Sequence, residues 1–199
     1  MARSRDTALR LELLDRVVEY LAANGLGAAS LRPIAQALDV SLNRLVHHFG
    51  TKQELVAAAL DRVIEIQVEV ERSWLATCPE MSQMELHRRW WKWMNASPAN
   101  LALTRLGYEA ATLDATASGL PGAVRAAQVG VWRDGIEQRL IAAGLPADAA
   151  HTEASLVKAT FTGLITDLIA TGDRRRLTIA LEEWLARLER QFGGPSAQD

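Results

Sequence analysis

The side chains that could recognise another molecule most specifically lie between residues 30 and 52 of this 199-residue sequence. Arg44 can bind the O6 and N7 atoms of guanine through two hydrogen bonds, and the neighbouring Asn43 can pair with adenine in the same way. Other residues of the stretch could contact a nucleic acid through hydroxyl, imidazole, guanidinium or ammonium groups: Ser30, Arg32, Ser41, His47 and Lys52. Each could also be an ordinary solvated side chain, so the elements that carry them decide between the two interpretations.

Two short helices joined by a tight turn are predicted to hold these side chains. Apolar residues recur at helical spacing in both halves of the stretch: Leu31, Ile34, Ala35 and Leu38, then Leu45, Val46 and Phe49. Ser30 and Ser41 can cap the two helices with their hydroxyl groups, and Gly50 suits the end of the second. Two short helices in this arrangement form a helix-turn-helix motif, whose second helix enters the major groove of DNA.

This stretch resembles the helix-turn-helix of the TetR family of transcriptional regulators, over about residues 8–60. The matching positions are Ile34-Ala35, Val40-Ser41, Leu45, His48-Phe49, Thr51-Lys52 and Glu54-Leu55. Asp39 replaces the usual Gly of the turn, Leu42 replaces a common Lys, and Val46 replaces a Tyr that usually contacts phosphate. Leu42 and Val46 still belong to the predicted DNA-binding set, although the family's polar contacts cannot be carried over at these two positions.

The rest of the sequence predicts an all-α chain of about nine helices with no convincing strand. The expected helices beyond the motif cover residues 8–24, 51–74, 82–95, 98–117, 121–143, 147–171 and 174–191, with an N-terminal arm at residues 1–7 and a tail at residues 193–199. Thr51 and Glu54 form a predicted capping box at the start of the long helix. We expect an N-terminal three-helix DNA-binding domain at residues 1–54. A C-terminal helical bundle at residues 55–199 would bind a ligand and dimerise.

A tryptophan-rich segment, MELHRRWWKWMN, could line a ligand pocket. Pockets for drug-sized molecules are mostly apolar and aromatic with few polar groups, although aromatic residues on a helix more often pack in a core. The predicted pocket residues are Trp90, Trp93, Met94, Tyr108, Glu109, Trp132 and Phe161.

The last two predicted helices carry apolar stripes that could serve the core or a partner subunit. The TetR resemblance implies that they pack against their copies as a four-helix bundle, and such a contact needs one self-complementary face. The predicted homodimer interface consists of Ala159, Gly163, Leu181, Trp184 and Leu188.

Composition and charge narrow the function classes. The formal net charge is −2 and the pI about 6.1, but residues 1–52 hold seven basic and five acidic residues and are therefore slightly basic. A single Cys and the lack of a signal peptide or membrane span favour the cytoplasm. No catalytic motif is present, and His47 and His48 point about 100° apart on a helix, so we expect no enzyme activity, metal or cofactor.

The TetR resemblance implies a ligand-responsive regulator, in the first instance a repressor. Its dimer would bind a palindromic operator in double-stranded DNA and release it when a small apolar or aromatic effector binds. The alternative is a helical ligand-binding or scaffold protein that has lost DNA binding, which Leu42, Val46 and the acidic pI support. An all-α enzyme would rest on isolated acidic residues alone.

Overall fold

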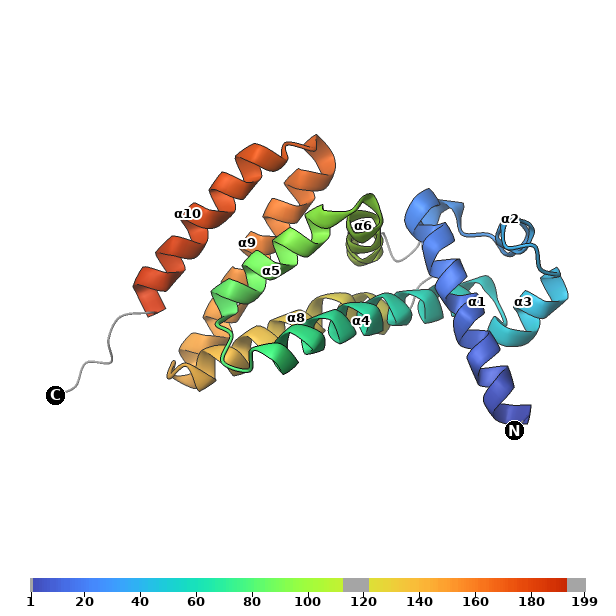
Figure 1. Ribbon diagram of the computed structural model, residues 1–199, viewed down its shortest axis with the longest axis horizontal. Coiled ribbons are helices and arrows are strands. Elements are labelled where there is room, and N and C mark those ends of the chain that lie inside the picture. The colour runs from blue at the N-terminus through green and yellow to red at the C-terminus, as the bar shows by residue number, and fades with distance from the viewer. Residues whose placement is uncertain (1, 113–121, 193–199) are drawn as a thin grey trace. The chain divides into compact units, whose positions relative to one another are not determined.

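The computed structural model describes the backbone of residues 2–112 and 122–192, and the side chains of residues 6–111 and 132–192. Within these ranges the chain forms nine α-helices and one short 3-10 helix, with no strand (Figure 1). The all-α class with an N-terminal helix-turn-helix is thereby confirmed. None of the described helices is both long and apolar enough to cross a lipid bilayer.

The helices follow one another along the chain with short connections. Their bounds are α1 Ala2–Asn24, η1 Leu26–Ala28, α2 Leu31–Ala37, α3 Leu42–Phe49, α4 Lys52–Thr77, α5 Gln83–Ala96, α6 Pro98–Thr112, α8 Gly122–Ala142, α9 Ala147–Thr171 and α10 Arg174–Phe192.

Two predicted boundaries were wrong. Helix α1 begins at Ala2, so the segment predicted as an arm is helical, because no Pro or Gly precedes Gly25 to interrupt it. Helix α4 extends three residues further than predicted, to Thr77, and Pro79 lies two residues beyond its end. The predicted end of the 98–117 helix and the tail at residues 193–199 lie outside the described residues.

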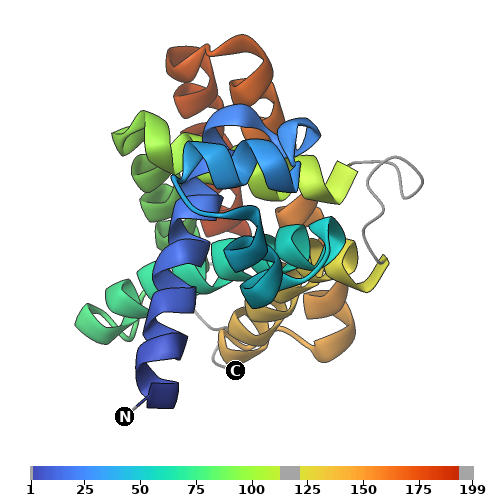
Figure 2. The same ribbon diagram turned by 90° about the vertical axis from the view of Figure 1, so that its right-hand side faces the viewer.

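The chain divides into two compact units. The first consists of residues 1–77 and 94–130, and the second of residues 78–93 and 131–199. Figure 2 looks onto the N-terminal helices of the first unit, which are drawn in blue. The proposed functional boundary after residue 54 falls within α4 and stays a prediction.

The first unit has a continuous apolar core that includes α6, although α6 is distant in sequence. Leu21 of α1, Leu45 of α3 and Leu60 of α4 are each fully buried, and Leu106 and Ala110 of α6 belong to the same cluster. Burying a Leu side chain stabilises a fold by about 1.5–3 kcal/mol, so this cluster fixes the helices that carry the motif.

The second unit is built on α9 and α10, which pack together with α5. Leu181 and Leu185 of α10 are fully buried. Polar contacts join α5 to α10: Arg88 binds Glu182 at 2.8 Å and Glu189 at 2.6 Å, and the Trp91 Nε1–H donates to the Thr178 hydroxyl at 2.8 Å. Trp91 is 5% exposed and therefore a core residue.

Candidate DNA interface and effector region

Backbone hydrogen bonds close the end of α2 at the turn that leads to α3. The Val40 N–H donates to the Ala35 carbonyl at 3.0 Å and the Asp39 N–H to the Gln36 carbonyl at 3.2 Å, which is the Schellman pattern. Asp39 has φ 51°, in the left-handed region that Asp tolerates better than most residues. The turn therefore forms without the glycine that is usual at this position.

The two serines at the helix starts differ. The Ser41 hydroxyl accepts the Arg44 N–H at 3.1 Å, as predicted. Ser30 occupies the equivalent position before α2, but its side chain makes no capping hydrogen bond, so that part of the prediction was wrong. A capping hydroxyl accepts from the second or third helical residue, and the third residue of α2 is Pro33, which has no N–H.

Helix α3 packs into the core through apolar side chains and exposes its polar side chains to solvent. Leu45 is fully buried and Phe49 is 5% exposed, whereas Asn43, Arg44 and His47 are exposed. The other predicted DNA-binding residues are placed as follows: Ser30, Arg32, Ser41, Val46 and Lys52 are exposed, and Leu42 is half-buried.

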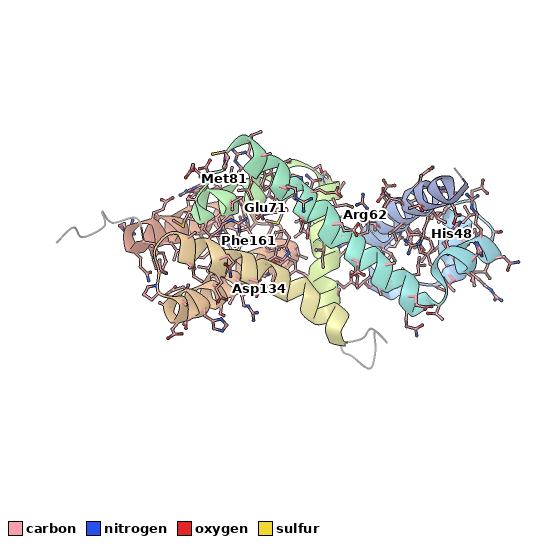
Figure 3. All side chains as sticks on the ribbon, turned by 90° about the horizontal axis from the view of Figure 1, so that it is seen from below. His48, Arg62, Glu71, Met81, Asp134 and Phe161 are labelled. Atoms are coloured by element: carbon pink, nitrogen blue, oxygen red, sulfur yellow. The ribbon has the colours of Figure 1, made fainter. Side chains whose placement is uncertain are left out.

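Contacts from α1 and α4 hold the end of α3. The Arg10 guanidinium lies 5.1 Å from the centre of the Phe49 ring, and its Nε donates to the His48 carbonyl at 3.3 Å (His48 is labelled in Figure 3). Thr51 and Glu54 form the predicted capping box: the Thr51 N–H donates to the Glu54 carboxylate at 2.7 Å and the Glu54 N–H to the Thr51 hydroxyl at 3.3 Å. The Thr51 N–H holds the pKa of the Glu54 carboxyl below its usual range.

Gly50 is required between α3 and this capping box. Its φ is 72°, and a Cβ at this position would lie 2.3 Å from the Glu54 Oε2 atom. A side chain here would therefore meet backbone strain and would displace the Glu54 carboxylate from its hydrogen bonds to Thr51.

Helix α1 is fixed by charged side chains from α4 and α6. The Arg62 guanidinium of α4 binds Asp15 at 2.7 Å and also Glu65 and Glu69 on its own helix (Figure 3). From α6, Arg105 donates to the Ala22 carbonyl at 2.8 Å near the end of α1.

Glu109 of α6 takes a structural position in the first unit. Its Oε1 accepts the Leu26 N–H of η1 at 2.9 Å, and a Cβ on Gly25 would lie 3.4 Å from its carboxylate. Met94 and Tyr108, two other predicted pocket residues, belong to the same unit.

Three of the predicted pocket residues come together in the second unit. The ring centres of Trp90 and Trp93 are 5.3 Å apart, and those of Trp90 and Trp132 are 5.1 Å apart, both pairs edge to face. This geometry is favourable for aromatic pairs. Helix α8 thus brings Trp132 to the tryptophan segment of α5.

A second aromatic group forms around a buried histidine. His87 is 3% exposed, and its ring centre lies 4.6 Å from that of Phe161 and 5.5 Å from that of Trp184. The His87 Nδ1 lies 2.7 Å from the Gln83 carbonyl, which assigns the ring proton to Nδ1.

Burial around His87 changes its own ionisation and that of a neighbouring lysine. Burial lowers the pKa of His87 to about 4, and the charges of Lys158 and Arg139 contribute to the lowering. Burial also lowers the pKa of the half-buried Lys158 to about 8, and its Nζ donates to the Thr162 hydroxyl at 2.9 Å. Lys158 was missed from the sequence, although its spacing from Ala154, Phe161 and Ile165 places it on the buried stripe of α9.

The predicted dimer residues fall into two groups. Ala159 and Gly163 are exposed on α9, whereas Leu181 is fully buried and Leu188 is 8% exposed within their own unit. Trp184 is half-buried beside His87. Two exposed apolar side chains that the prediction omitted lie on the same helices, Leu156 of α9 at 55% exposure and Ile179 of α10 at 64%.

Residues 13–59 match the sequence profile of the bacterial regulatory proteins of the tetR family. The N-terminal helices are thus similar to the helix-turn-helix domain of that family. No curated protein sequence matches the chain.

Solved structures extend the TetR-type similarity to most of the chain. A protein from Rhodococcus sp. assigned to the TetR family has a TM-score of 0.69 at 17% identity, over 90% of this chain and 96% of that one. A transcriptional regulator from Saccharomonospora viridis in complex with choline has a TM-score of 0.68 at 16% identity, over 90% and 96%. A TetR transcriptional regulator from Legionella pneumophila has a TM-score of 0.65 at 15% identity, over 87% and 95%. These similarities establish the TetR fold.

Proposed function

We propose that this protein is a ligand-responsive transcriptional repressor that binds a palindromic operator as a homodimer. The observation that carries the proposal is the orientation of α3. Its exposed Asn43, Arg44 and His47 are available to DNA, while Leu45 and Phe49 anchor the helix in the core. This is the arrangement that a recognition helix needs in a major groove.

The proposed contacts divide into base reading and positioning. Arg44 reads guanine and Asn43 reads adenine, both through pairs of hydrogen bonds. The exposed hydroxyl and basic groups that surround α3 position the duplex through its backbone: Ser30, Arg32, Ser41, His47 and Lys52. Lys52 opens α4, whose N-terminal amides also favour a phosphate.

The proposed dimer forms through α9 and α10. Ala159 and Gly163 allow a second helix to approach closely, and the exposed Leu156 and Ile179 add apolar area. Leu181, Trp184 and Leu188 support this face from inside their own unit. Two copies would present α3 to successive major grooves, about 34–36 Å apart.

The dimer proposal has a direct test. A Cβ at Gly163 would have nothing within 4 Å, so a Gly163→Glu protomer should fold normally, while the carboxylate would be buried between two copies. We expect the variant to sediment as a monomer and to lose operator affinity. Gln138→Glu, at an exposed position on α8 outside the proposed interface, is the matched control and should remain dimeric. A dimeric Gly163→Glu variant would place the interface elsewhere.

The proposed effector is a small apolar or aromatic molecule bound in the second unit near Trp90, Trp93 and Trp132. Choline in the Saccharomonospora viridis protein suggests a quaternary ammonium as another class, since such cations bind tryptophan faces. Lys158 and Arg139, which lie near His87, would repel a cation, so we favour an uncharged effector for this protein. The effector would release DNA because it binds more tightly to a conformation that does not fit the operator.

The experiment that tests DNA binding is selection of bound duplexes from a random double-stranded library at moderate salt. Enrichment of a palindrome by the wild type but not by Arg44→Ala would support the proposal. Arg187→Ala, at an exposed position on α10 where the guanidinium binds Glu183 of the same helix, controls for loss of a positive charge. Affinity should also fall steeply as salt rises. A folded, dimeric protein that enriches no sequence would instead support a helical ligand-binding or scaffold protein that has lost DNA binding.

A further inference from the structure

We propose that Leu42 and Val46 form an apolar pair on α3 that reads the 5-methyl groups of thymines in each operator half-site. This inference rests on the proposed DNA binding and deepens it. It assigns a base-recognition role to the two positions where the sequence lacks the polar residues usual in TetR-type motifs.

The directions of the side chains on α3 place this pair beside the polar row. Leu45 and Phe49 define the inward direction, because both are buried. Residues four positions apart share one side of a helix, so Leu42 lies next to Val46 on one flank of the outward face. Asn43 and His47 form the neighbouring row in the same way. Apolar and polar groups therefore run side by side along the helix.

Val46 is available to a partner. It is 43% exposed, and among the described residues it is the one exposed large hydrophobic on α2 or α3. Leu42 is half-buried beneath it, one helical turn earlier. Single exposed apolar residues are common on protein surfaces, so exposure alone decides nothing. The deciding observation is that Val46 adjoins Asn43 and His47 on the helix proposed to enter the groove.

The chemistry of the major groove selects the partner of such a pair. Neither side chain can form a hydrogen bond, so neither can bind a phosphate oxygen or a polar base edge. Thymine alone among the four bases places a methyl group on the floor of the major groove. Contact with that methyl removes apolar surface of both partners from water, which is favourable.

The pair is also held rigidly enough to discriminate. Val has one strongly preferred side-chain conformation in a helix, so little conformational freedom is lost on contact. The Ser41 hydroxyl caps the start of α3, and Arg10 packs against Phe49 at its end. The methyl groups of Val46 are thus fixed relative to Arg44 and Asn43, and each half-site should contain thymine close to the bases that these polar residues read.

The test removes single methyl groups from the operator. In the duplex enriched by the full-length dimer, each thymine is replaced in turn by deoxyuridine, which keeps every hydrogen-bonding group and lacks only the 5-methyl group. At one or two positions per half-site we expect the affinity to fall by about three- to fivefold per methyl group, the size expected for exposing one methyl-sized apolar group. Replacement in both half-sites together should give about the product of the two effects.

Protein variants assign the effect to the pair. In Val46→Ala the difference between thymine and deoxyuridine should nearly disappear at one position, and in Leu42→Ala it should shrink at the same or the adjacent position. His47→Ala is the matched control, because it should weaken binding while retaining the full methyl effect. Thermal unfolding would verify that all three variants are folded.

Three outcomes would overturn the inference, and they differ in what they leave standing. If no deoxyuridine replacement changes affinity while Arg44→Ala abolishes binding, the protein is a DNA-binding regulator but the apolar pair reads no methyl group. If Val46→Ala and Leu42→Ala retain the full methyl effect, another residue reads it. If no duplex is enriched at all, the proposed DNA binding fails and the inference fails with it.

Discussion

In the first unit Leu45 and Phe49 are buried and Arg44 faces solvent, whereas in the second unit His87 is buried against Phe161 and Trp184, and the charge of the half-buried Lys158 acts on it. Polar groups on an exposed helix cost the fold almost nothing. Polar groups in an aromatic interior cost free energy unless they are well paired. A residue such as Arg44 can therefore bind another molecule without affecting the stability of the fold. A polar residue such as His87 lowers the stability of the fold unless its polar atoms are well paired.

The largest expected effect concerns Arg44, an exposed residue of α3. Arg44→Ala should reduce operator affinity by about 100-fold or more, because each guanine contact is worth about 1–3 kcal/mol and a dimer makes two of them. The free energy of unfolding should change by no more than about 0.5 kcal/mol, as is usual for exposed positions. Duplex-binding titrations and urea unfolding would measure the two quantities. A large loss of stability would show that Arg44 supports the fold.

The second prediction concerns the buried histidine. The folded pKa of His87 is about 4, compared with an ordinary value of 6.5. Between these two values the unfolded chain binds a proton that the folded protein does not, so the free energy of unfolding falls as pH falls from 6.5 towards 4. At pH 5 the expected loss relative to pH 7.5 is about 2 kcal/mol.

Two variants check the origin of that pH dependence. His87→Asn should remove the decrease between pH 6.5 and 4 while lowering stability at every pH through lost packing. His151→Gln should retain the decrease, because the His151 side chain is 61% exposed. Chemical unfolding across this pH range gives the slopes, and an unchanged slope in His87→Asn would assign the effect to other groups.

The smallest expected effect concerns Lys158, and it tests directly whether a charged group inside the second unit lowers the stability of the fold. Lys158→Met keeps a similar length and removes a half-buried charge that burial disfavours, so we expect the free energy of unfolding at pH 7 to rise by about 1 kcal/mol. Arg139→Met, which removes another basic group near His87 that bonds to the Gly135 carbonyl, is the comparison variant. A lower stability of Lys158→Met would mean that the ammonium group stabilises the second unit.

Local features of the fold followed from the sequence because their causes are local. The Ser41 cap and the Thr51–Glu54 capping box each join residues three positions apart. The turn at Asp39 was predictable for the same reason. The Ser30 cap failed for an equally local cause, since Pro33 removes the hydrogen that the hydroxyl would have accepted.

Contacts between distant segments could not be predicted from spacing. Glu109 and Leu26 are 83 residues apart, and nothing in either segment indicates that the carboxylate accepts that N–H. The burial of His87 depends on Phe161 and Trp184 from two other helices, so helical periodicity on α5 alone did not reveal it. The assignments of DNA, pocket and dimer residues remain predictions for the experiments above.

The attachment of α6 to the first unit has a consequence for building hybrid regulators. Arg105 and Glu109 bind the two sides of the corner between α1 and η1, and Leu106 and Ala110 complete the core beneath it. A recombinant exchange that transplanted only the N-terminal residues would leave this corner without its partners and expose part of the core. The transferable module is therefore discontinuous, and a working chimera would have to include α6 together with the helices that we propose bind DNA.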